Sequence, residues 1–188
     1  MNIHQKKKIL CNGFTIIEML IALSIIALLS TLVIANFTSL RVNSNLNSET
    51  EQLGALLRQT QLWALSGQTR GGIRPVGGWA LHVEECSVGS CKHILFADTN
   101  PAGVPNRIYD AGLDELASEY VLDPSINVIS VFPSNAGVLD IDFDSPYAGI
   151  YFNGMQVDAE AVIVLEHEKT GAQRTVRIDR DSGRINLE

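Results

Sequence analysis

The stretch Gly13-Phe14-Thr15-Ile16-Ile17-Glu18 joins a short basic segment to a long apolar one. Three lysines at positions 6–8 precede it, and the apolar run from Phe14 to Ala35 has 22 residues with Glu18 as its only charged one. As an α-helix this run would be about 33 Å long, close to the hydrocarbon thickness of a bilayer. The next charge is Arg41, so the positive-inside rule predicts a cytoplasmic N-terminus and a remainder across the membrane.

Three kinds of N-terminal segment combine a basic start with an apolar run. A secretory signal peptide has a shorter apolar region and a small-residue cleavage site, whereas Val33-Ile34-Ala35 places a valine at one key position. A lipoprotein carries its apolar region before the acylated cysteine, whereas Cys11 precedes the run. The third kind is a leader of residues 1–13, cut between Gly13 and Phe14.

Glu18 favours the cleaved leader. A carboxylate in a membrane helix costs roughly 2.5–3.5 kcal/mol at the helix centre and less near an end. Cleavage after Gly13 frees the amine of Phe14, and pairing this amine with Glu18 of a neighbouring chain lowers the cost of burying both charges. The alternative is that Glu18, one turn into the helix, simply reaches the membrane interface.

The segment from Gly13 to Leu20 resembles the N-terminal signature of type IV pilins and type II secretion pseudopilins. The resemblance implies cleavage after Gly13 by a prepilin peptidase, N-methylation of Phe14, and a role for Glu18 in recruitment to the inner-membrane assembly platform. It also implies a single-pass protein of the bacterial inner membrane with a periplasmic domain. Such a subunit is held in membrane lipid until it assembles with other pilins or pseudopilins into a fibre.

Later segments resemble the GspH/FimT branch of minor pseudopilins and minor pilins. These segments are residues 53–67 with Trp79, Ile94–Asn100, Gly149–Gly154 and Ser182–Ile185. The branch implies a non-catalytic minor pseudopilin near the tip of a type II secretion pseudopilus. The alternatives are a FimT-like minor pilin that primes a type IV pilus, with or without DNA binding, and a plain single-span membrane protein that is not processed at Gly13.

Charge argues against nucleic acid as a partner. Residues 1–13 hold three of the 14 basic residues and none of the 21 acidic ones, so their removal changes the formal charge from −7 to −10. Some FimT-like proteins bind DNA through a C-terminal basic motif, for which Arg180 and Arg184 are the candidates. Gly183-Arg184 lacks the second basic residue of that motif, and neighbouring acids dilute the charge.

Cys86 and Cys91 remain after removal of the leader, and an oxidising compartment favours a disulfide between them. Zinc would need two further ligands, for which His82 and His93 are the candidates, but their spacing matches no common zinc module. The stretch 98–103 begins like a calcium loop, yet position twelve is Tyr109 where a glutamate belongs. The sequence therefore predicts no metal and no cofactor. It also shows no local catalytic signature, so we expect no enzyme.

The remaining pattern predicts an α+β fold of pilin type, in which a long N-terminal helix packs on an antiparallel sheet or small sandwich. Leu46, Thr50, Leu53, Leu57 and Ala64 form one largely apolar helical stripe that ends before Gly67, so residues 36–67 continue the helix of residues 14–35. Residues 68–188 form the β-rich domain. Alternation over Val138–Asp144 predicts one face on a core and aspartates toward water. The predicted strands are Trp79–Val83, His93–Phe96, Asn127–Phe132, Val138–Asp144, Ile150–Phe152, Val162–Glu166 and Arg174–Ile178, with hairpin turns at Asn153-Gly154 and Lys169-Thr170-Gly171.

Overall fold

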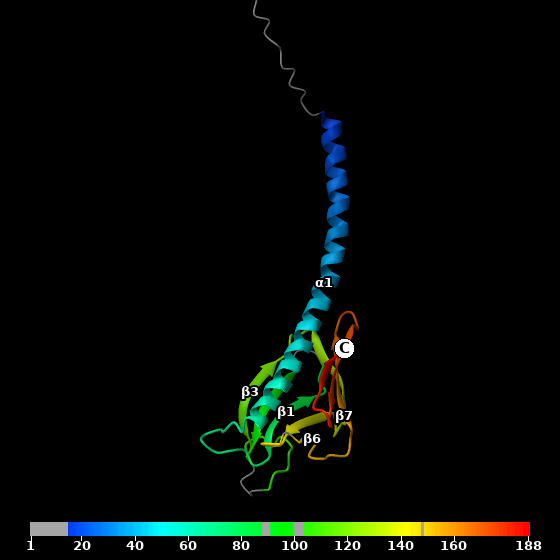
Figure 1. Cartoon of the computed structure of the whole chain (residues 1–188). Coiled ribbons are helices and arrows are strands. Elements are labelled where there is room, and N and C mark those ends of the chain that lie inside the picture. The colour runs from blue at the N-terminus through cyan, green and yellow to red at the C-terminus, as the bar shows by residue number, and fades with distance from the viewer. Residues whose placement is uncertain (1–14, 88–90, 100–103, 148) are drawn as a thin grey trace, which may run out of the picture. The chain divides into compact units, whose positions relative to one another are not determined.

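The computed structural model describes residues 15–87, 91–99, 104–147 and 149–188. Within these ranges the chain forms one α-helix followed by nine β-strands, which confirms the predicted α+β class (Figure 1). The chain divides into two units, residues 1–41 and residues 42–188, and helix α1 (Ile16–Leu65) runs through both.

Helix α1 ends where the sequence predicts. Gly67 has a φ of +62°, a conformation that glycine adopts without steric cost. Its N–H donates to the carbonyl of Ala64 at 3.1 Å, and the N–H of Gln68 donates to the carbonyl of Trp63 at 2.9 Å. This pair of bonds is the Schellman arrangement, which satisfies carbonyls that the end of a helix leaves free.

The strands pair antiparallel in two sheets. One has the order β3-β2-β1-β5-β6 and the other the order β4-β7-β8-β9. Seven strands overlap the predicted ones, whereas β3 and β9 lie outside every predicted strand. Their bounds are β1 Gly78–Glu84, β2 Lys92–Asp98, β3 Glu115–Val121, β4 Ile126–Phe132, β5 Val138–Phe143, β6 Ile150–Phe152, β7 Glu160–His167, β8 Gln173–Asp179 and β9 Ile185–Leu187.

One core lies between the C-terminal part of α1 and the two sheets of the second unit. The predicted helical stripe is buried at every position: Leu46, Thr50, Leu53, Leu57 and Ala64 are at most 3% exposed. The stripe packs with apolar residues from both sheets in a single cluster. Trp63 packs against this cluster, where its ring meets that of Trp79 edge to face with centroids 4.8 Å apart. Burial of one helical stripe is what joins the helix to the sheets.

The two predicted turns have different outcomes. The turn at residues 169–171 joins β7 to β8 as expected, with the N–H of His167 donating to the carbonyl of Ala172. Asn153 and Gly154 also form a tight turn, with φ values of +48° and +76°. It does not join β6 to a following strand, because only Met155 pairs back to Phe152 before the chain enters β7 of the other sheet. The prediction of a β-hairpin that joins β6 to a following strand at Asn153-Gly154 was therefore wrong.

Candidate functional site

The N-terminus of α1 carries the first candidate site. The N–H and the hydroxyl of Thr15 both donate to Oε2 of Glu18, each at 2.9 Å, and the N–H of Glu18 donates to the Thr15 hydroxyl at 3.3 Å. This is a capping box, in which the first residue and the third helical residue satisfy each other's backbone donors. Hydrogen bonds from the described residues reach only one of the two carboxylate oxygens. The other predicted site residues here, Gly13 and Phe14, lie outside the described residues.

Glu18 stands on an apolar helix surface. The large apolar side chains from Ile16 to Leu29 are between 52% and 83% exposed. A shallow groove beside the carboxylate is lined by Glu18, Met19, Ala22, Leu23 and Ile26. The hydroxyls of Ser24 and Ser30 donate to carbonyls of their own helix, so these polar groups present little unsatisfied hydrogen-bonding capacity to the surroundings.

The predicted membrane span, residues 14–35, begins at Phe14, just before the first described residue. In the part of the chain that the structure describes, none of the helices meets the combined requirements of length and apolar composition for crossing a membrane.

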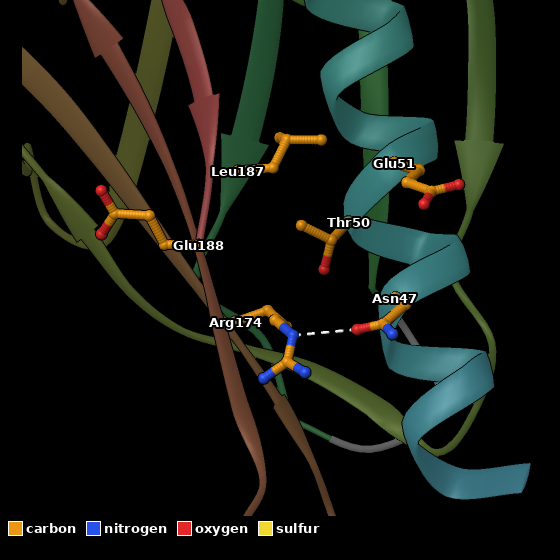
Figure 2. Close-up of a pocket in the computed structure, with 6 residues that line it drawn as sticks. All are labelled: Asn47, Thr50, Glu51, Arg174, Leu187 and Glu188. Carbon is orange, nitrogen blue, oxygen red and sulfur yellow. Dashed lines mark hydrogen bonds between the residues drawn. The ribbon is translucent and has the colours of Figure 1, made fainter. Parts of the chain in front are cut away.

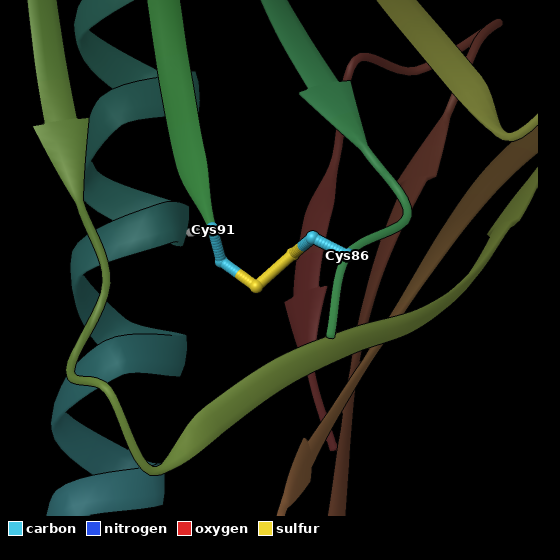
Figure 3. The surroundings of a disulfide bond; sticks show 2 residues. All are labelled: Cys86 and Cys91. Carbon is cyan, nitrogen blue, oxygen red and sulfur yellow. A yellow bond between two sulfur atoms is a disulfide. The ribbon is translucent and has the colours of Figure 1, made fainter. Parts of the chain in front are cut away.

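The disulfide is the second predicted feature, and it is confirmed. Cys86 and Cys91 are bonded, with their Cα atoms 5.4 Å apart, between the end of β1 and the start of β2 (Figure 3). The N–H of Cys86 donates to the carbonyl of Val128 in β4, and the N–H of Leu122 donates to the carbonyl of Cys91. The disulfide therefore ties the end of β1, whose Cys86 also bonds to β4, to the start of β2.

The zinc alternative has no geometric support. The two sulfur atoms are consumed by the disulfide. His82 pairs with Ile94 and His93 with Val83, so the register places the two imidazoles on opposite faces of the sheet. Within the described ranges, no group of three or more His, Cys, Asp or Glu residues could hold a metal ion.

The two arginines considered for DNA contact are engaged within the protein. The guanidinium of Arg180 pairs with Asp181 at 2.9 Å and donates to the carbonyl of Gln156 at 2.6 Å. The guanidinium of Arg184 donates to Asn186 at 2.8 Å. The structure therefore does not gather the two side chains into one free basic surface.

The calcium-like stretch behaves as part of a loop packed on the first sheet. Its first residue, Asp98, accepts the N–H of Arg107 at 2.9 Å. Tyr109, at the twelfth position, places its ring 5.1 Å from Phe96 and 4.9 Å from His82. Residues 100–103 lie outside the described residues. Tyr109 thus acts as a packing residue rather than a cation ligand.

The prediction that the aspartates of β5 face water was wrong. Asp140 is 1% exposed and Asp142 is fully buried. Residues 104–114, which we call the strap, lie over this outer face, with Tyr109 packed on Ala80 and Phe96. Alternation identifies the two faces of a strand, but it does not reveal that a distant loop covers the polar one.

Buried charges under the strap have shifted pKa values. Nδ1 of His82 lies 2.7 Å from Asp140 and its Nε2 lies 3.0 Å from Glu84. Burial lowers the pKa of His82, but the two carboxylates outweigh burial and leave that pKa raised. Burial also raises the pKa of the Asp142 carboxyl well above its ordinary value, against the opposing charge of Arg107.

A small cavity of about 160 Å³ lies between α1 and the C-terminal strands within the second unit (Figure 2). Nε of Arg174 donates to the side-chain oxygen of Asn47 at 2.9 Å across one side of it. Its charged lining is mixed, because Glu51 and Glu188 line the cavity together with Arg174. The cavity therefore has no strong preference for one sign of ligand charge.

Comparison with known proteins identifies one motif. Residues 10–34 match the family model described as the prokaryotic N-terminal methylation motif. No curated protein and no solved structure matches the chain. The match covers the junction at Gly13 and Phe14 together with Glu18. It supports a protein of type IV pilin-like class, and it implies processing by a prepilin peptidase and assembly with pilins.

Proposed function

We propose that this chain is a minor pseudopilin of a type II secretion system, a non-catalytic subunit that assembles near the tip of the pseudopilus. Before assembly it is anchored in the bacterial inner membrane by residues 14–35, with residues 36–188 in the periplasm. The methylation motif supports the pilin-like part of this proposal. The secretion role and the tip position rest on the sequence resemblance to the GspH/FimT branch.

The observation that carries the proposal is the position of Glu18. Its carboxylate lies one turn inside an apolar helix that begins just after the predicted cleavage site. Of its two oxygens, only Oε2 accepts hydrogen bonds from described residues. Oε1 therefore remains able to accept a bond from the freed Phe14 amine of a neighbouring subunit. The capping box also supplies the carboxylate with two donors of its own chain, which makes a charge at this depth less costly.

The exposed apolar surface of α1 explains why helices pack together when Glu18 pairs with a neighbouring amine. In lipid the surface is already solvated, so there is no hydrophobic force between helices. On extraction into a fibre, the same surface must pack against other helices or be exposed to water, at about 25 cal/mol per Å². Helix packing then covers the apolar side chains, and the pair of Glu18 with an amine sets the register between neighbours.

Two variants separate charge pairing from helix capping. Glu18→Gln keeps a residue that can complete the capping box but removes the charge, whereas Thr15→Ala removes the cap and keeps the charge. We expect Glu18→Gln to abolish co-purification with other pseudopilins and Thr15→Ala to reduce it only modestly. Normal assembly of Glu18→Gln would contradict the pairing.

Intact-mass analysis tests the processing on which the proposal depends. Full-length protein co-expressed with a prepilin peptidase should lose residues 1–13 and gain one methyl group on Phe14, and it should remain intact without the peptidase. Co-purification with minor pseudopilins then tests the secretion role. Association only with minor pilins of a type IV pilus would replace the secretion role by the FimT-like alternative.

A further inference from the structure

A groove of about 300 Å³ lies beside β6, where the turn after β4 meets the loop that leads to β7 (Figure 1). We call it the β6 groove. The turn contributes Pro133, Ser134 and Asn135 to its lining, and the loop contributes Met155 and Asp158. The groove thus joins segments of both sheets and combines apolar, hydrogen-bonding and charged side chains.

Hydrogen bonds fix the two walls of the β6 groove relative to each other. Oδ1 of Asn153 accepts the N–H of Asp140 at 2.8 Å, and Nδ2 of Asn153 donates to the carbonyl of Pro133 at 3.1 Å. The Ser134 hydroxyl accepts the N–H of Gly137 at 3.0 Å, which closes the turn itself. The groove is therefore formed before a partner arrives, and this lowers the conformational entropy that binding costs.

Apolar side chains are exposed in the groove and next to it. Met155 is 64% exposed. Phe132 and Val157, which directly precede groove residues in the chain, are 51% and 77% exposed. Large exposed apolar side chains that gather around one groove indicate an interaction site, whereas scattered ones do not. Methionine suits such a site because its flexible thioether adapts to the shape of a partner.

One carboxylate of the groove lacks a partner among the described residues. Asp158 is half-buried, and no described residue forms an ion pair or a hydrogen bond with its carboxylate. The bases on adjoining segments are engaged elsewhere, since Arg180 pairs with Asp181 and Arg177 pairs with Glu160. A half-buried charge without a counter-ion attracts an external cation more strongly than a fully hydrated charge does.

The charge of the second unit has the same sign as that of the groove. Residues 42–188 contain 20 of the 21 acidic residues, all but Glu18, and 10 of the 14 basic ones, all but the lysines at positions 6–8 and Arg41. Their formal charge is therefore −10. Long-range attraction favours a basic partner, and it disfavours a second copy of this acidic unit.

We propose that the β6 groove docks a short segment of another protein in which an apolar side chain lies next to an arginine or a lysine. The apolar side chain packs on Met155 and Pro133, and the cation pairs with the Asp158 carboxylate. The Ser134 hydroxyl and the Asn135 carboxamide bond to the backbone of the segment. A volume at the lower end of the range of about 300–1,000 Å³ for ligand pockets suits a few side chains rather than a large cofactor.

This contact goes beyond the proposed function, because it needs neither processing at Gly13 nor pairing of Glu18. A failure of either of those leaves the docking prediction standing, and the reverse also holds.

Amide NMR of the isotope-labelled full chain in a non-ionic detergent tests the docking with three short synthetic peptides. One peptide has a central leucine flanked by arginines, the second has glycine in place of the leucine, and the third has the leucine flanked by glutamates. We expect only the first to reach saturation, with shifts at the amides of Ser134, Asn135 and Met155. In the unmodified chain, a rise in ionic strength from about 0.05 M to about 0.5 M should weaken its Kd at least threefold.

Two substitutions separate the charge from the apolar contact. Asp158→Asn keeps the shape of the side chain and removes its charge, and it should raise the Kd at least about fivefold. Met155→Ala should raise it at least about threefold. The matched variant Glu168→Gln, at an exposed turn at the opposite end of β7, should keep the Kd of the wild type. Amide shifts away from the groove check that each variant is folded.

Several results would overturn the docking proposal. These are equal binding of the three peptides, shifts that lie outside the groove, and an unchanged Kd in Asp158→Asn. Shifts of the groove amides when the protein alone is concentrated would assign the groove to a second copy, and they would overturn the proposal as well.

Discussion

The N-terminal and C-terminal parts of helix α1 contain similar apolar residues but differ in how far these residues are buried. From Ile16 to Leu29 the large apolar side chains are all more than half exposed. In the second unit, Leu46, Leu53 and Leu57 are fully buried. Leucine occurs in both parts, so side-chain type does not decide which one is buried.

The difference lies in the distribution of the apolar residues around the helix. The N-terminal part is apolar on all sides, which is the pattern of a helix that needs lipid or other helices around it. The C-terminal part concentrates its apolar residues in one stripe and leaves polar residues such as Ser48 and Gln59 exposed. A single stripe is satisfied by the chain's own sheets, whereas an all-round surface needs surroundings that one subunit does not provide.

Replacing one leucine by alanine in each part gives the strongest test of this difference in burial. Leu57→Ala leaves a cavity in the core and should lower the free energy of unfolding of the second unit by about 2–5 kcal/mol. Leu20→Ala, in the exposed part, should change it by less than about 0.5 kcal/mol. Urea unfolding of the full chain in detergent, followed by the fluorescence of Trp63 and Trp79, measures both. Equal effects would show that the two parts do not differ as described.

A change of pH should show how well the core beside the buried helical stripe excludes water from His93. Burial, with a smaller contribution from the charge of His82, lowers the pKa of His93 to about 4. At His93 the unfolded chain takes up a proton near pH 6.5 and the folded chain does not, so this residue should contribute a loss of stability of about 3 kcal/mol as the pH drops from 6.5 to 4.

The variant His93→Phe isolates this contribution. The ring stacks near Tyr120, and its Nδ1 makes no hydrogen bond to the described residues, so an apolar ring of similar shape can replace it. Unfolding measured across this pH range should show the variant losing about 3 kcal/mol less than the wild type. Parallel stability curves for the two proteins would contradict a neutral, buried His93.

Removal of the disulfide should weaken the second unit and leave the exposed part of α1 unaffected. A crosslink that closes so short a loop contributes about 2 kcal/mol in the chain-entropy account. Replacement of Cys86 and Cys91 by serine should therefore lower the urea midpoint without loss of helix signal. An unchanged midpoint would mean that the backbone bonds to β4 already hold the two sheets together.

The smallest expected effect concerns the contact of β3 with the helix. The Tyr120 hydroxyl lies 2.8 Å from both Glu49 and Gln52 of α1. Tyr120→Phe removes these interactions and should cost about 1 kcal/mol. The matched variant Tyr147→Phe, at a side chain that is 87% exposed, should cost nothing measurable. A larger loss for Tyr147→Phe would assign the stability of this region to another contact.

Much of the fold could be predicted because its signals are local. The helical stripe, the end of α1 at Gly67 and seven of the nine strands in the described chain follow from periodicity and turn residues. β3 was missed because it is an edge strand whose sequence, Glu115–Val121, does not alternate. β9 has only three residues and no Asn-Gly turn beside it, whereas the equally short β6 is marked by Asn153-Gly154.

The candidate sites also divide into those that local sequence predicts and those that depend on distant residues. The disulfide is closed within a short loop, so spacing sufficed to predict Cys86 with Cys91. The pairing of Arg107 with Asp142 joins segments 35 residues apart across a sheet, and no local pattern announces it. The capping box formed by Thr15 and Glu18 is visible as a Thr-x-x-Glu spacing, a local signal that the membrane setting of Glu18 obscures.

Local sequence signals suffice for the junction at Gly13 and Phe14, the apolar run with Glu18, the extent of the helix and most strands. Each of these depends on residues close together in the chain, where propensity, capping and periodicity act. Long-range packing sets the division of the strands into two sheets, the burial of the β5 aspartates and the position of the strap that covers them. These features depend on which distant segment supplies a partner, and the free energy of a buried charge is fixed by that partner rather than by its neighbours in sequence.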